Sequence, residues 1–421
     1  MSKKNNYMIK LGKKAKIASK RLESADLKLK NSILEKYLGY LKRDKKKILK
    51  ENDKDILYTK SKKNNFAVLN RLKIDSYKIE QMRESIYEII KFKDPIGKIL
   101  FSTKRPNGLV VKKISIPIGV IGIIYESRPN VTADVAALCF KSSNAVILKG
   151  GSEAFNTNKI LSDLFRKAIK NKNFDENCVQ FIKNRNRSTV DYLLSNMKEY
   201  IDIIIPRGGK NLVQKVQTKS VIPTIGHLEG ICHVYVNSES NLNMAIKVLK
   251  NSKMRNTTIC GAAETLLIDS KCLKTHSKPL LDSLNKMGCK IIGEKILQKY
   301  YKGNFTIAKE EDWKTEYLHS TISVKVVDGV NDAIDHINKY GTNHTDTIIT
   351  KNKKIAKKFV MGVKSSIAAH NASTQFADGG ELGFGAEIGI STNKMPPRGP
   401  VGLEQLTTYK YILKGNGQVR N

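Results

Sequence analysis

Short runs of β-branched and aliphatic residues alternate with helix-length segments through most of the chain, and this alternation constrains the fold most. The runs NAVILKGG, CVQFI and IDIIIPRGG in the first half are separated by segments whose apolar residues have helical spacing. The runs ETLLID, STISVKVVD, TDTIIT and SSIAAH repeat the pattern in the second half. Strands that alternate with helices of this length predict parallel α/β sheets. We therefore expect two α/β domains in tandem.

The regions beside this alternation have different patterns. Residues 1–95 place apolar residues at three- and four-residue spacing, which predicts helices that end near Pro95 and Gly97. The stretch GLVVKKISIPIGVIGIIYE predicts two successive strands broken near Pro117. The tail after residue 370 is rich in glycine and lacks a helical period, which is typical of a long loop that lines a site.

Length and composition indicate a soluble globular protein. The chain has 421 residues, with 40% hydrophobic and 27% charged residues, which predicts two or three domains. No apolar run approaches the roughly 20 residues that span a bilayer, and the first residues lack the apolar region of a signal peptide. The absence of acidic residues before Glu23 also fits a mitochondrial presequence, although lysine rather than arginine dominates there.

The formal net charge of +36 raises the question of a polyanionic partner. The lysines are spread over the whole chain, without interleaved aromatic residues or a nucleic-acid-binding motif. A solvated lysine surface, which attracts anionic substrates, is the favoured interpretation. A basic nucleic-acid-binding protein stays as an alternative.

The six cysteines indicate neither a metal site nor a disulfide framework. They are Cys139, Cys178, Cys232, Cys260, Cys272 and Cys289. No pair has C-x-x-C spacing and no histidine lies at zinc-finger distance, so we predict no metal and a reducing cytoplasm. Cys260, in KMRNTTICGAAETLL, follows small and hydroxylated residues that offer exposure and hydrogen-bond donors. It is a candidate reactive thiol, and a buried core cysteine is the alternative.

Several predicted strands end in residues that suit a phosphate-bearing ligand. These ends carry Lys149, Gly150 and Gly151, then Arg207, Gly208 and Gly209, and the stretch from Glu126 to Asn130. Ligands bind at the carboxyl ends of parallel strands, and glycines there let backbone N–H groups approach a phosphate. None of these ends has the G-x-G-x-x-G pattern, and each glycine pair alone also fits an ordinary turn.

Specific motifs resemble one enzyme family. The stretches PIGVIGIIYESRPNVTADVAALCFKSSNAVILKGG, YIDIIIPRGG and RGPVGLEQLTTYKY, with the Cys260 stretch, are similar to the glutamate-5-semialdehyde dehydrogenases, or γ-glutamyl phosphate reductases. This family belongs to the aldehyde dehydrogenase superfamily. The resemblance implies an aldehyde dehydrogenase-like α/β fold with an NADP-binding domain, a catalytic domain and a small β-flap for oligomerisation. The expected NADP-binding domain comprises residues 1–103 and 119–230, and the expected catalytic domain comprises residues 231–400. The expected flap comprises residues 104–118 and 401–421.

The resemblance also implies a reaction. NADPH reduces L-glutamyl 5-phosphate to L-glutamate 5-semialdehyde with release of phosphate, as the second step of proline biosynthesis. Cys260 acts as a thiolate and forms a thioester, which divides the reduction into two easier steps. Because the pKa of a free cysteine thiol is about 8.5, the site must favour the thiolate, and Arg255 is one candidate for that effect. Asn130 and the Cys260 N–H would form an oxyanion hole, although Asn130 also suits a helix N-cap.

The remaining site residues are carried over from the same resemblance. Glu316 matches the glutamate that binds the nicotinamide ribose, and a surface carboxylate is its alternative. Substrate-binding candidates are Arg128, Arg255 and Arg398 for the anionic groups, and Asn371 and Ser373 for the α-amino acid end. The cofactor-binding candidates are Glu316 and the residues of the two glycine-ended strands, where Lys149 suits the 2′-phosphate of NADPH.

Glu229 supports a rival function. Hydrolytic aldehyde dehydrogenases carry a water-activating glutamate near this position, whereas a phosphate-dependent enzyme would lose its thioester to such a base. We expect Glu229 to be structural or to face the cofactor, and a hydrolytic aldehyde dehydrogenase stays as the alternative. The expected partners are the small-molecule substrate, a transiently bound glutamate kinase and further copies of the chain, in a dimer or a dimer of dimers.

Overall fold

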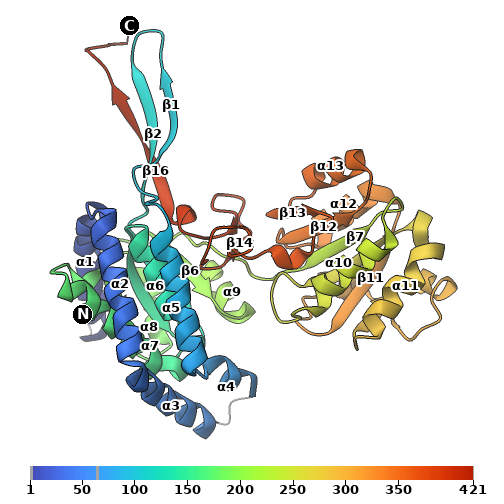
Figure 1. Cartoon of the computed structure of the whole chain (residues 1–421), viewed down its shortest axis with the longest axis horizontal. Coiled ribbons are helices and arrows are strands. Elements are labelled where there is room, and N and C mark those ends of the chain that lie inside the picture. The colour runs from blue at the N-terminus through green and yellow to red at the C-terminus, as the bar shows by residue number, and fades with distance from the viewer. Residues whose placement is uncertain (1–2, 63–65, 421) are drawn as a thin grey trace. The chain divides into compact units, whose positions relative to one another are not determined.

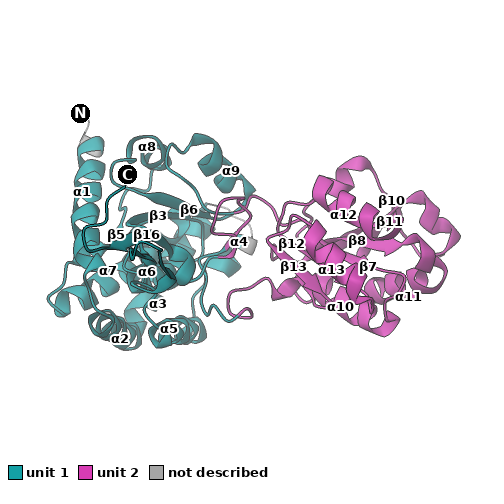
Figure 2. Cartoon of the chain, turned by 90° about the horizontal axis from the view of Figure 1, so that it is seen from above, with its two compact units in different colours: residues 1–226, 383–389, 401–421 teal, residues 227–382, 390–400 magenta. Residues whose placement is uncertain are grey.

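The structure, a computed structural model, describes residues 3–62 and 66–420. It divides into two compact units, which differ in colour in Figure 2. Unit 1 comprises residues 1–226, 383–389 and 401–421, and unit 2 comprises residues 227–382 and 390–400. Both units are built on parallel sheets with helices, which confirms the predicted α/β class.

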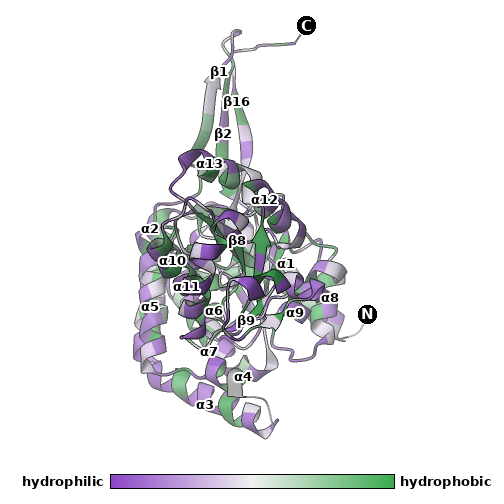
Figure 3. Ribbon diagram, turned by 90° about the vertical axis from the view of Figure 1, so that its right-hand side faces the viewer, coloured by the Kyte–Doolittle hydropathy of each residue, from purple (hydrophilic) through white to green (hydrophobic). Residues whose placement is uncertain are grey.

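The N-terminal part of unit 1 is helical, as predicted (Figure 1). Its helices are α1 (Lys3–Glu23), α2 (Leu27–Arg43), α3 (Lys45–Ser61), α4 (Phe66–Leu72) and α5 (Ser76–Lys91). Asp26 and Asp75 begin two of them by accepting the backbone N–H groups of Leu29 and Lys78. Hydrophilic and hydrophobic segments alternate along α3 and α5 in Figure 3, as expected for helices with one buried face.

Four parallel strands form the sheet of unit 1 in the order β5-β4-β3-β6. They are β3 (Val120–Tyr125), β4 (Ala145–Gly150), β5 (Val179–Phe181) and β6 (Ile203–Arg207). The intervening and following helices are η1 (Ser152–Ala154), η2 (Glu176–Cys178), α6 (Asn130–Lys141), α7 (Phe155–Asn171), α8 (Ser188–Asn196) and α9 (Lys210–Lys219). The chain runs from β3 to β4 and β5 on one side and then places β6 on the other side of β3. This reversal of strand order is a topological switch point, where open α/β sheets bind ligands.

An antiparallel sheet of three strands also clusters with unit 1. It consists of β1 (Ile99–Lys104), β2 (Val110–Pro117) and β16 (Thr407–Lys414) in the order β1-β2-β16. This sheet overlaps the ranges expected for the flap, but its first strand begins at Ile99, whereas the expected range begins at residue 104. β2 ends at Pro117, because proline cannot continue the ladder of hydrogen bonds.

Unit 2 holds a parallel sheet of seven strands in the order β10-β9-β11-β8-β7-β12-β13. The strands are β7 (Cys232–Val236), β8 (Ala263–Asp269), β9 (Lys290–Gly293), β10 (Thr306–Ile307), β11 (Thr321–Val327), β12 (Thr345–Ile349) and β13 (Ile367–His370). The helices are α10 (Leu242–Met254), η3 (Ser270–Cys272), α11 (Leu273–Asn285), η4 (Lys295–Lys299), η5 (Glu310–Lys314), α12 (Gly329–Tyr340), α13 (Lys353–Gly362) and η6 (Thr374–Phe376). Leu266 and Ile268 of β8 pack with α10 and α11, and Leu267 packs with α12 and α13. Alternate side chains of the strand thus pack on opposite faces of the sheet.

The C-terminal tail returns to unit 1 earlier than predicted. Residues 383–389 belong to unit 1, between two segments of unit 2, and the strands β14 (Ile390–Ser391) and β15 (Gly399–Pro400) follow, with η7 (Glu404–Leu406) before β16. Ile388, Val401 and Leu406 lie in the hydrophobic core of unit 1, and the Ile388 N–H donates to the Val401 carbonyl at 2.9 Å. The units therefore meet at residues 226 and 227 rather than 230 and 231, and 383–389 lie outside the expected catalytic range. The roles expected for these domains stay predictions.

Some elements were not predicted from the sequence. They include α9, β7, α10, β9 and α13 and the two-residue strands β10, β14 and β15. The signal for α10 was present, because the Asn241 side chain caps it by accepting the Met244 N–H, and apolar residues follow at helical spacing. Within the described part of the chain, no helix combines the length and the apolarity that crossing a membrane requires.

Candidate active site

Six of the predicted cofactor-binding residues lie at one edge of the unit 1 sheet. Tyr125 at the end of β3 pairs with Gly150 at the end of β4 and with Arg207 at the end of β6. Lys149, Gly151, Gly208 and Gly209 directly adjoin these positions. The strand order reverses between β3 and β6, so this edge is the switch point of the sheet. The structure thus brings the two glycine-ended strands together, as the sequence predicted.

Carboxylates shape this edge, and one of them was not predicted. The Glu126 carboxylate accepts the Gly209 N–H at 2.8 Å, and a Cβ added at Gly208 would lie 2.7 Å from the Glu126 carboxyl carbon. Glu153 accepts hydrogen bonds from the hydroxyls of Ser127 at 2.9 Å and Ser152 at 3.0 Å. The edge therefore combines backbone groups with fixed negative charges.

Lys149 is the buried cation of this edge. Its Nζ donates to the Gly150 carbonyl at 3.0 Å. Burial lowers the pKa of Lys149, and the nearby Glu153 carboxylate acts in the opposite direction. The glycines, the switch point and a buried ammonium fit the phosphates of a dinucleotide cofactor.

Asn130 and Arg128 also belong to unit 1, beyond the end of β3. Asn130 is the first residue of α6, and Pro129 rather than Asn130 occupies the N-cap. The Asn130 amide lies 3.4 Å from Asp134 Oδ2, to which it donates. Asn130 and Arg128 are both exposed. The roles of Asn130 in an oxyanion hole and of Arg128 in substrate binding stay predictions.

Cys260 lies in unit 2, in the turn between α10 and β8. It precedes the first residue of β8, Ala263, which pairs with Cys232 at the start of β7. On the other side of β7 lies β12, which begins at Thr345, directly after His344. The thiol therefore lies near the amino ends of parallel strands, whereas the cofactor residues of unit 1 lie at carboxyl ends.

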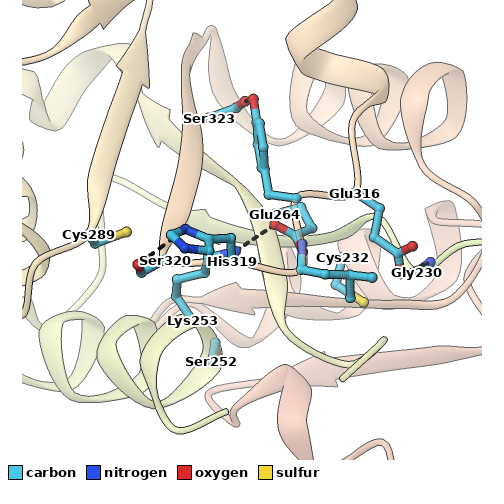
Figure 4. A network of polar contacts seen from close by, with 12 residues as sticks. Gly230, Cys232, Ser252, Lys253, Glu264, Cys289, Glu316, His319, Ser320 and Ser323 are labelled. Carbon is cyan, nitrogen blue, oxygen red and sulfur yellow. Dashed lines mark hydrogen bonds and ion pairs between the residues drawn. The ribbon is translucent and has the colours of Figure 1, made fainter. Parts of the chain in front are cut away.

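The backbone of Cys260 is held by close packing. A Cβ added at Gly230 would lie 2.2 Å from the Cys260 carbonyl oxygen, so only glycine fits there. The Cys232 thiol donates to the same carbonyl at 3.1 Å. Gly230 itself donates its N–H to Glu316 Oε1 at 2.8 Å. Figure 4 labels both residues, together with Cys232. Glu316, predicted to bind the nicotinamide ribose, thus positions the segment that packs on Cys260.

The loop before Cys260 is fastened by Gln375, a buried residue of η6. Its amide Nε2 donates to the carbonyls of Ser252 at 2.9 Å and Asn256 at 3.2 Å. The Arg255 guanidinium lies 3.4 Å from Gln375 Oε1. The Ser252 hydroxyl donates to Ser373 Oγ at 3.1 Å. Side chains of η6 therefore fix the path of the chain from α10 to the thiol.

A buried ion pair lies between α10 and β8. Lys253 Nζ is 2.5 Å from Glu264 Oε2, and both side chains are inaccessible to solvent. The other Glu264 oxygen accepts the Leu318 N–H at 3.2 Å. Burial raises the pKa of Glu264 to about 7, against the opposing effect of Lys253. The pair connects α10, β8 and the loop that carries Glu316.

Cys260 differs from the other five cysteines, which all lie in the described ranges. Cys260 is partly exposed, whereas the others are buried. Burial raises the pKa of each of these five thiols, Cys139, Cys178, Cys232, Cys272 and Cys289. The thiolate is the reactive form of cysteine, so the buried five are unsuited to nucleophilic chemistry. This contrast supports the choice of Cys260 from the sequence.

Two histidines beside Cys260 were not predicted to have a role. His227, Cys260 and His344 place one nitrogen, the sulfur and a second nitrogen within 4.8 Å of one another. His227 is partly exposed, and its Nδ1 lies 2.8 Å from the Ile390 carbonyl. His344 is buried. An imidazole next to a thiol can take up its proton, so this group can generate a thiolate.

Comparisons with known proteins show the family of this chain. The model of the aldehyde dehydrogenase family matches residues 3–295. The gamma-glutamyl phosphate reductase of Paramagnetospirillum magneticum is 46% identical over 413 residues, covering 98% of this chain and 97% of the relative. This chain belongs to the gamma-glutamyl phosphate reductases of the aldehyde dehydrogenase family.

Other members of the family are similarly close. The gamma-glutamyl phosphate reductase of Methylobacterium radiotolerans is 43% identical over 410 residues, covering 97% of this chain and 95% of the relative. The crystal structure of the gamma-glutamyl phosphate reductase of Thermotoga maritima has a TM-score of 0.95 and 38% identity, covering 98% of this chain and 99% of that one. The aldehyde dehydrogenase-like fold and the family inferred from the motifs are confirmed.

The remaining predicted substrate residues of this family member have contacts within unit 2. The Asn371 amide contacts Thr350 at both ends, with 3.0 Å from Oδ1 to the Thr350 N–H and 3.0 Å from Nδ2 to the Thr350 carbonyl. The buried Ser373 accepts the Gln375 N–H at 3.2 Å, and Arg398 donates to the Lys364 carbonyl at 2.6 Å. These contacts hold the chain in place. Substrate binding by Asn371, Ser373, Arg255 and Arg398 stays a prediction.

Proposed function

We propose that this enzyme reduces L-glutamyl 5-phosphate to L-glutamate 5-semialdehyde with NADPH and releases phosphate, as the second step of proline biosynthesis. The observation that carries the proposal is Cys260, the partly exposed thiol beside two imidazoles, in a chain of the gamma-glutamyl phosphate reductase family. Five other thiols are buried and held protonated. The nucleophile of the reaction is therefore assigned to Cys260.

The proposed reaction has two steps at the sulfur. The Cys260 thiolate attacks the acyl carbon, the C–O bond to the phosphate breaks, and a thioester forms. The nicotinamide supplies the hydride that reduces this thioester. The resulting hemithioacetal collapses to the aldehyde, and Cys260 leaves as the thiolate. His227 or His344 takes up the thiol proton before the first step, and the fixed Cys260 backbone keeps the sulfur in one place.

The cofactor and substrate assignments follow the family resemblance. We assign the nicotinamide cofactor to the carboxyl-end edge of unit 1, where Lys149, the glycines of β4 and β6 and Arg207 converge. Lys149 suits the 2′-phosphate that distinguishes NADPH. Arg128, Arg255 and Arg398 are assigned to the phosphate and α-carboxylate of the substrate. Asn130 is assigned to the oxyanion that forms at the acyl carbon.

Glu229 is the residue that favours a second candidate function, that of a hydrolytic aldehyde dehydrogenase. It directly precedes Gly230, whose backbone packs on Cys260, so a carboxylate belongs to the segment beside the thiol. A hydrolytic aldehyde dehydrogenase would use such a group to activate water, and its product would be a carboxylic acid. The proposed reaction needs inorganic phosphate in the reverse direction, whereas the hydrolytic one does not.

The cellular setting is proposed on the same basis. All six cysteines are free thiols, which fits a reducing compartment such as the cytoplasm. The three-stranded sheet exposes Phe101, Tyr409, Tyr411 and Leu413, which suits its expected role in a homo-oligomer. A transient contact with glutamate kinase would shorten the path of the unstable acyl phosphate.

The test is the reverse reaction. NADP⁺ reduction by glutamate-5-semialdehyde is measured with and without inorganic phosphate, in the wild type, Cys260→Ala and the buried-thiol control Cys289→Ala. We expect phosphate-dependent turnover that falls at least about 10⁴-fold in Cys260→Ala and persists in Cys289→Ala. Turnover that is indifferent to phosphate would reject the proposal in favour of the hydrolytic function.

A further inference from the structure

The group formed by His227, Cys260 and His344 has the composition of a metal site. One ligand atom from each residue lies within 4.8 Å of the other two, and all three residues belong to unit 2. We infer that this group binds a thiophilic divalent cation, Zn²⁺, and that the bound cation reversibly blocks the Cys260 thiolate. The inference rests on the positions of the donors and does not depend on the proposed function.

The donor set is one that zinc prefers. Zn²⁺ binds thiolate sulfur and imidazole nitrogen, at about 2.3 Å and about 2.0–2.1 Å. Donor atoms around a tetrahedral ion are therefore closer to one another than 4.8 Å, and small rotations of the side chains bring them together. Three protein ligands leave a fourth position for water, as in open zinc sites. The partly exposed Cys260 and His227 give the ion a path from solvent.

The contact of His227 with the chain prepares one ligand. Its Nδ1 lies 2.8 Å from the Ile390 carbonyl oxygen, which can only accept a hydrogen bond. The proton of the neutral ring is therefore on Nδ1, and Nε2 carries the lone pair. A backbone carbonyl that fixes the tautomer in this way is the usual support of a metal-binding histidine.

His344 supplies an independent sign that a ligand is expected. The residue is fully buried, and its Nε2 has no hydrogen-bond partner among the described residues. A buried polar atom without a partner is costly, and a bound cation would remove that cost. The other nitrogen, Nδ1, lies 3.0 Å from Thr345 Oγ1 and 3.4 Å from Cys232 Sγ. The rings of His344 and His227 meet edge to face, with centroids 5.1 Å apart.

The consequence concerns the electrons of the sulfur. A thiolate that donates its lone pair to Zn²⁺ is no longer available as a nucleophile, and removal of the ion restores it without breaking a covalent bond.

The first experiment uses Co²⁺ as a visible substitute for zinc. The full-length protein is treated with a chelator and titrated with Co²⁺, and sulfur-to-cobalt charge transfer is recorded in the near ultraviolet. We expect one Co²⁺ per chain, displaced by Zn²⁺, with the charge-transfer band lost in Cys260→Ser. His227→Gln should weaken binding at least about 10-fold, since ligand loss exceeds the effect of losing a supporting contact. The exposed His319→Gln is the matched control and should bind as the wild type does.

A second measurement guards against variants that fail to fold. His344→Gln changes a buried residue, so the fold of this variant is checked by circular dichroism. If His344→Gln unfolds, the test uses His227→Gln, because His227 is partly exposed to solvent. Alkylation of Cys260 by iodoacetamide is followed by mass spectrometry with and without one equivalent of Zn²⁺. We expect zinc to slow alkylation in the wild type and His319→Gln and to have little effect in His227→Gln.

Two results would overturn the inference. One is Co²⁺ binding of equal affinity in the wild type and His227→Gln, which would mean that His227 is not a ligand and the three-residue site does not exist. The other is an alkylation rate that zinc does not change. Neither readout uses substrate or cofactor, so failure of the metal site and failure of the proposed reaction are distinguishable.

Discussion

The two units use opposite edges of their parallel sheets. In unit 1 the candidate site lies at the carboxyl ends of β3, β4 and β6, and it consists largely of backbone groups, glycines and carboxylates. In unit 2 it lies near the amino ends of β7, β8 and β12, and it consists of side chains around Cys260. All seven histidines of the chain belong to unit 2.

This difference fits what we propose each site holds. A dinucleotide is an anion with many equivalent contacts, so the strand ends and glycines that any α/β sheet provides are sufficient. A nucleophile must be held at one point, which requires packing from several segments. The difference predicts that unit 2 tolerates substitutions near its site less well than unit 1 does.

The largest expected effect concerns buried charge. Glu264→Gln would leave the inaccessible Lys253 ammonium without its partner, and we expect a loss of about 3–5 kcal/mol in the free energy of unfolding. In unit 1, Lys30 is equally inaccessible, but its partner Asp94 is 23% exposed and Lys30 also donates to Ser143 at 3.0 Å. Asp94→Asn should therefore cost less. The free energies of unfolding of both variants are compared by urea denaturation.

The cause can be separated from general damage to the core. The double variant Lys253→Met with Glu264→Leu removes both charges, and it should recover most of the lost stability, since an apolar pair of similar volume often replaces a buried ion pair. If Glu264→Gln and Asp94→Asn both lower the free energy of unfolding by less than about 1 kcal/mol, the buried Lys253–Glu264 pair does not stabilise unit 2.

The next effect compares two glycines. Gly230→Ala would place a methyl group 2.2 Å from the Cys260 carbonyl oxygen, so the backbone must move and displace the thiol. We expect kcat to fall about 10²-fold, the size of effect associated with a displacement of about 1 Å. Gly208→Ala meets the Glu126 side chain, which can rotate away, so we expect a change mainly in the KM for the cofactor.

A third glycine is the control for this pair. Gly39 in α2 has no heavy atom within 4 Å of an added Cβ, and Gly39→Ala should leave both kinetic constants unchanged. Equal losses of kcat in Gly230→Ala and Gly208→Ala would contradict the view that only the thiol site depends on exact backbone placement.

The two sites also differed in how far the sequence predicted them. The unit 1 edge was predictable because each glycine directly follows a buried run, and the carboxyl ends of neighbouring parallel strands must meet. The partial exposure of Cys260 was predictable from its polar surroundings. His227 and His344 were not, because they come from distant segments and only the sheet order, with β7 between β8 and β12, brings them together.

The fold shows the same limit. The alternation of strands and helices predicted both α/β units, because each element carries its own periodicity. The return of residues 383–389 to unit 1 was not predicted, since this glycine-containing segment has no periodicity and its place is set by the burial of Ile388 in a distant core. Local signals predicted most of the longer elements, and only packing determined which unit each tail segment joins.

The histidines predict acid sensitivity confined to unit 2. His336 is buried, and burial lowers its pKa to about 2, with nearby His233, Lys325 and Lys339 acting in the same direction. The unfolded state binds a proton below about pH 6.5 that the folded state does not, so stability falls as pH decreases, by about 1.4 kcal/mol at pH 5.5. Hydrogen exchange at pH 7.5 and 5.5 should show protection lost in unit 2 peptides before unit 1 peptides.

A single substitution tests the source of this effect. Neither ring nitrogen of His336 has a hydrogen-bond partner among the described residues, and the ring packs on Trp313 and Tyr340. His336→Phe should therefore keep the packing and remove the titration, which reduces the loss of protection at pH 5.5. Earlier loss of protection in unit 1 would show that another group controls the acid response.

The smallest expected effect lies at the unit 1 edge. The Glu153 carboxylate is fixed by the hydroxyls of Ser127 and Ser152, and it influences the pKa of Lys149. If Lys149 receives the 2′-phosphate of NADPH, the fixed negative charge opposes it, and Glu153→Gln should lower the KM for NADPH about 2–10-fold with little change for NADH. Glu84→Gln, an exposed carboxylate of α5, controls for the change in net charge. A KM that rises for both cofactors would instead mean that Glu153 binds the shared part of the dinucleotide, so that this edge, like the thiol site, depends on one particular side chain.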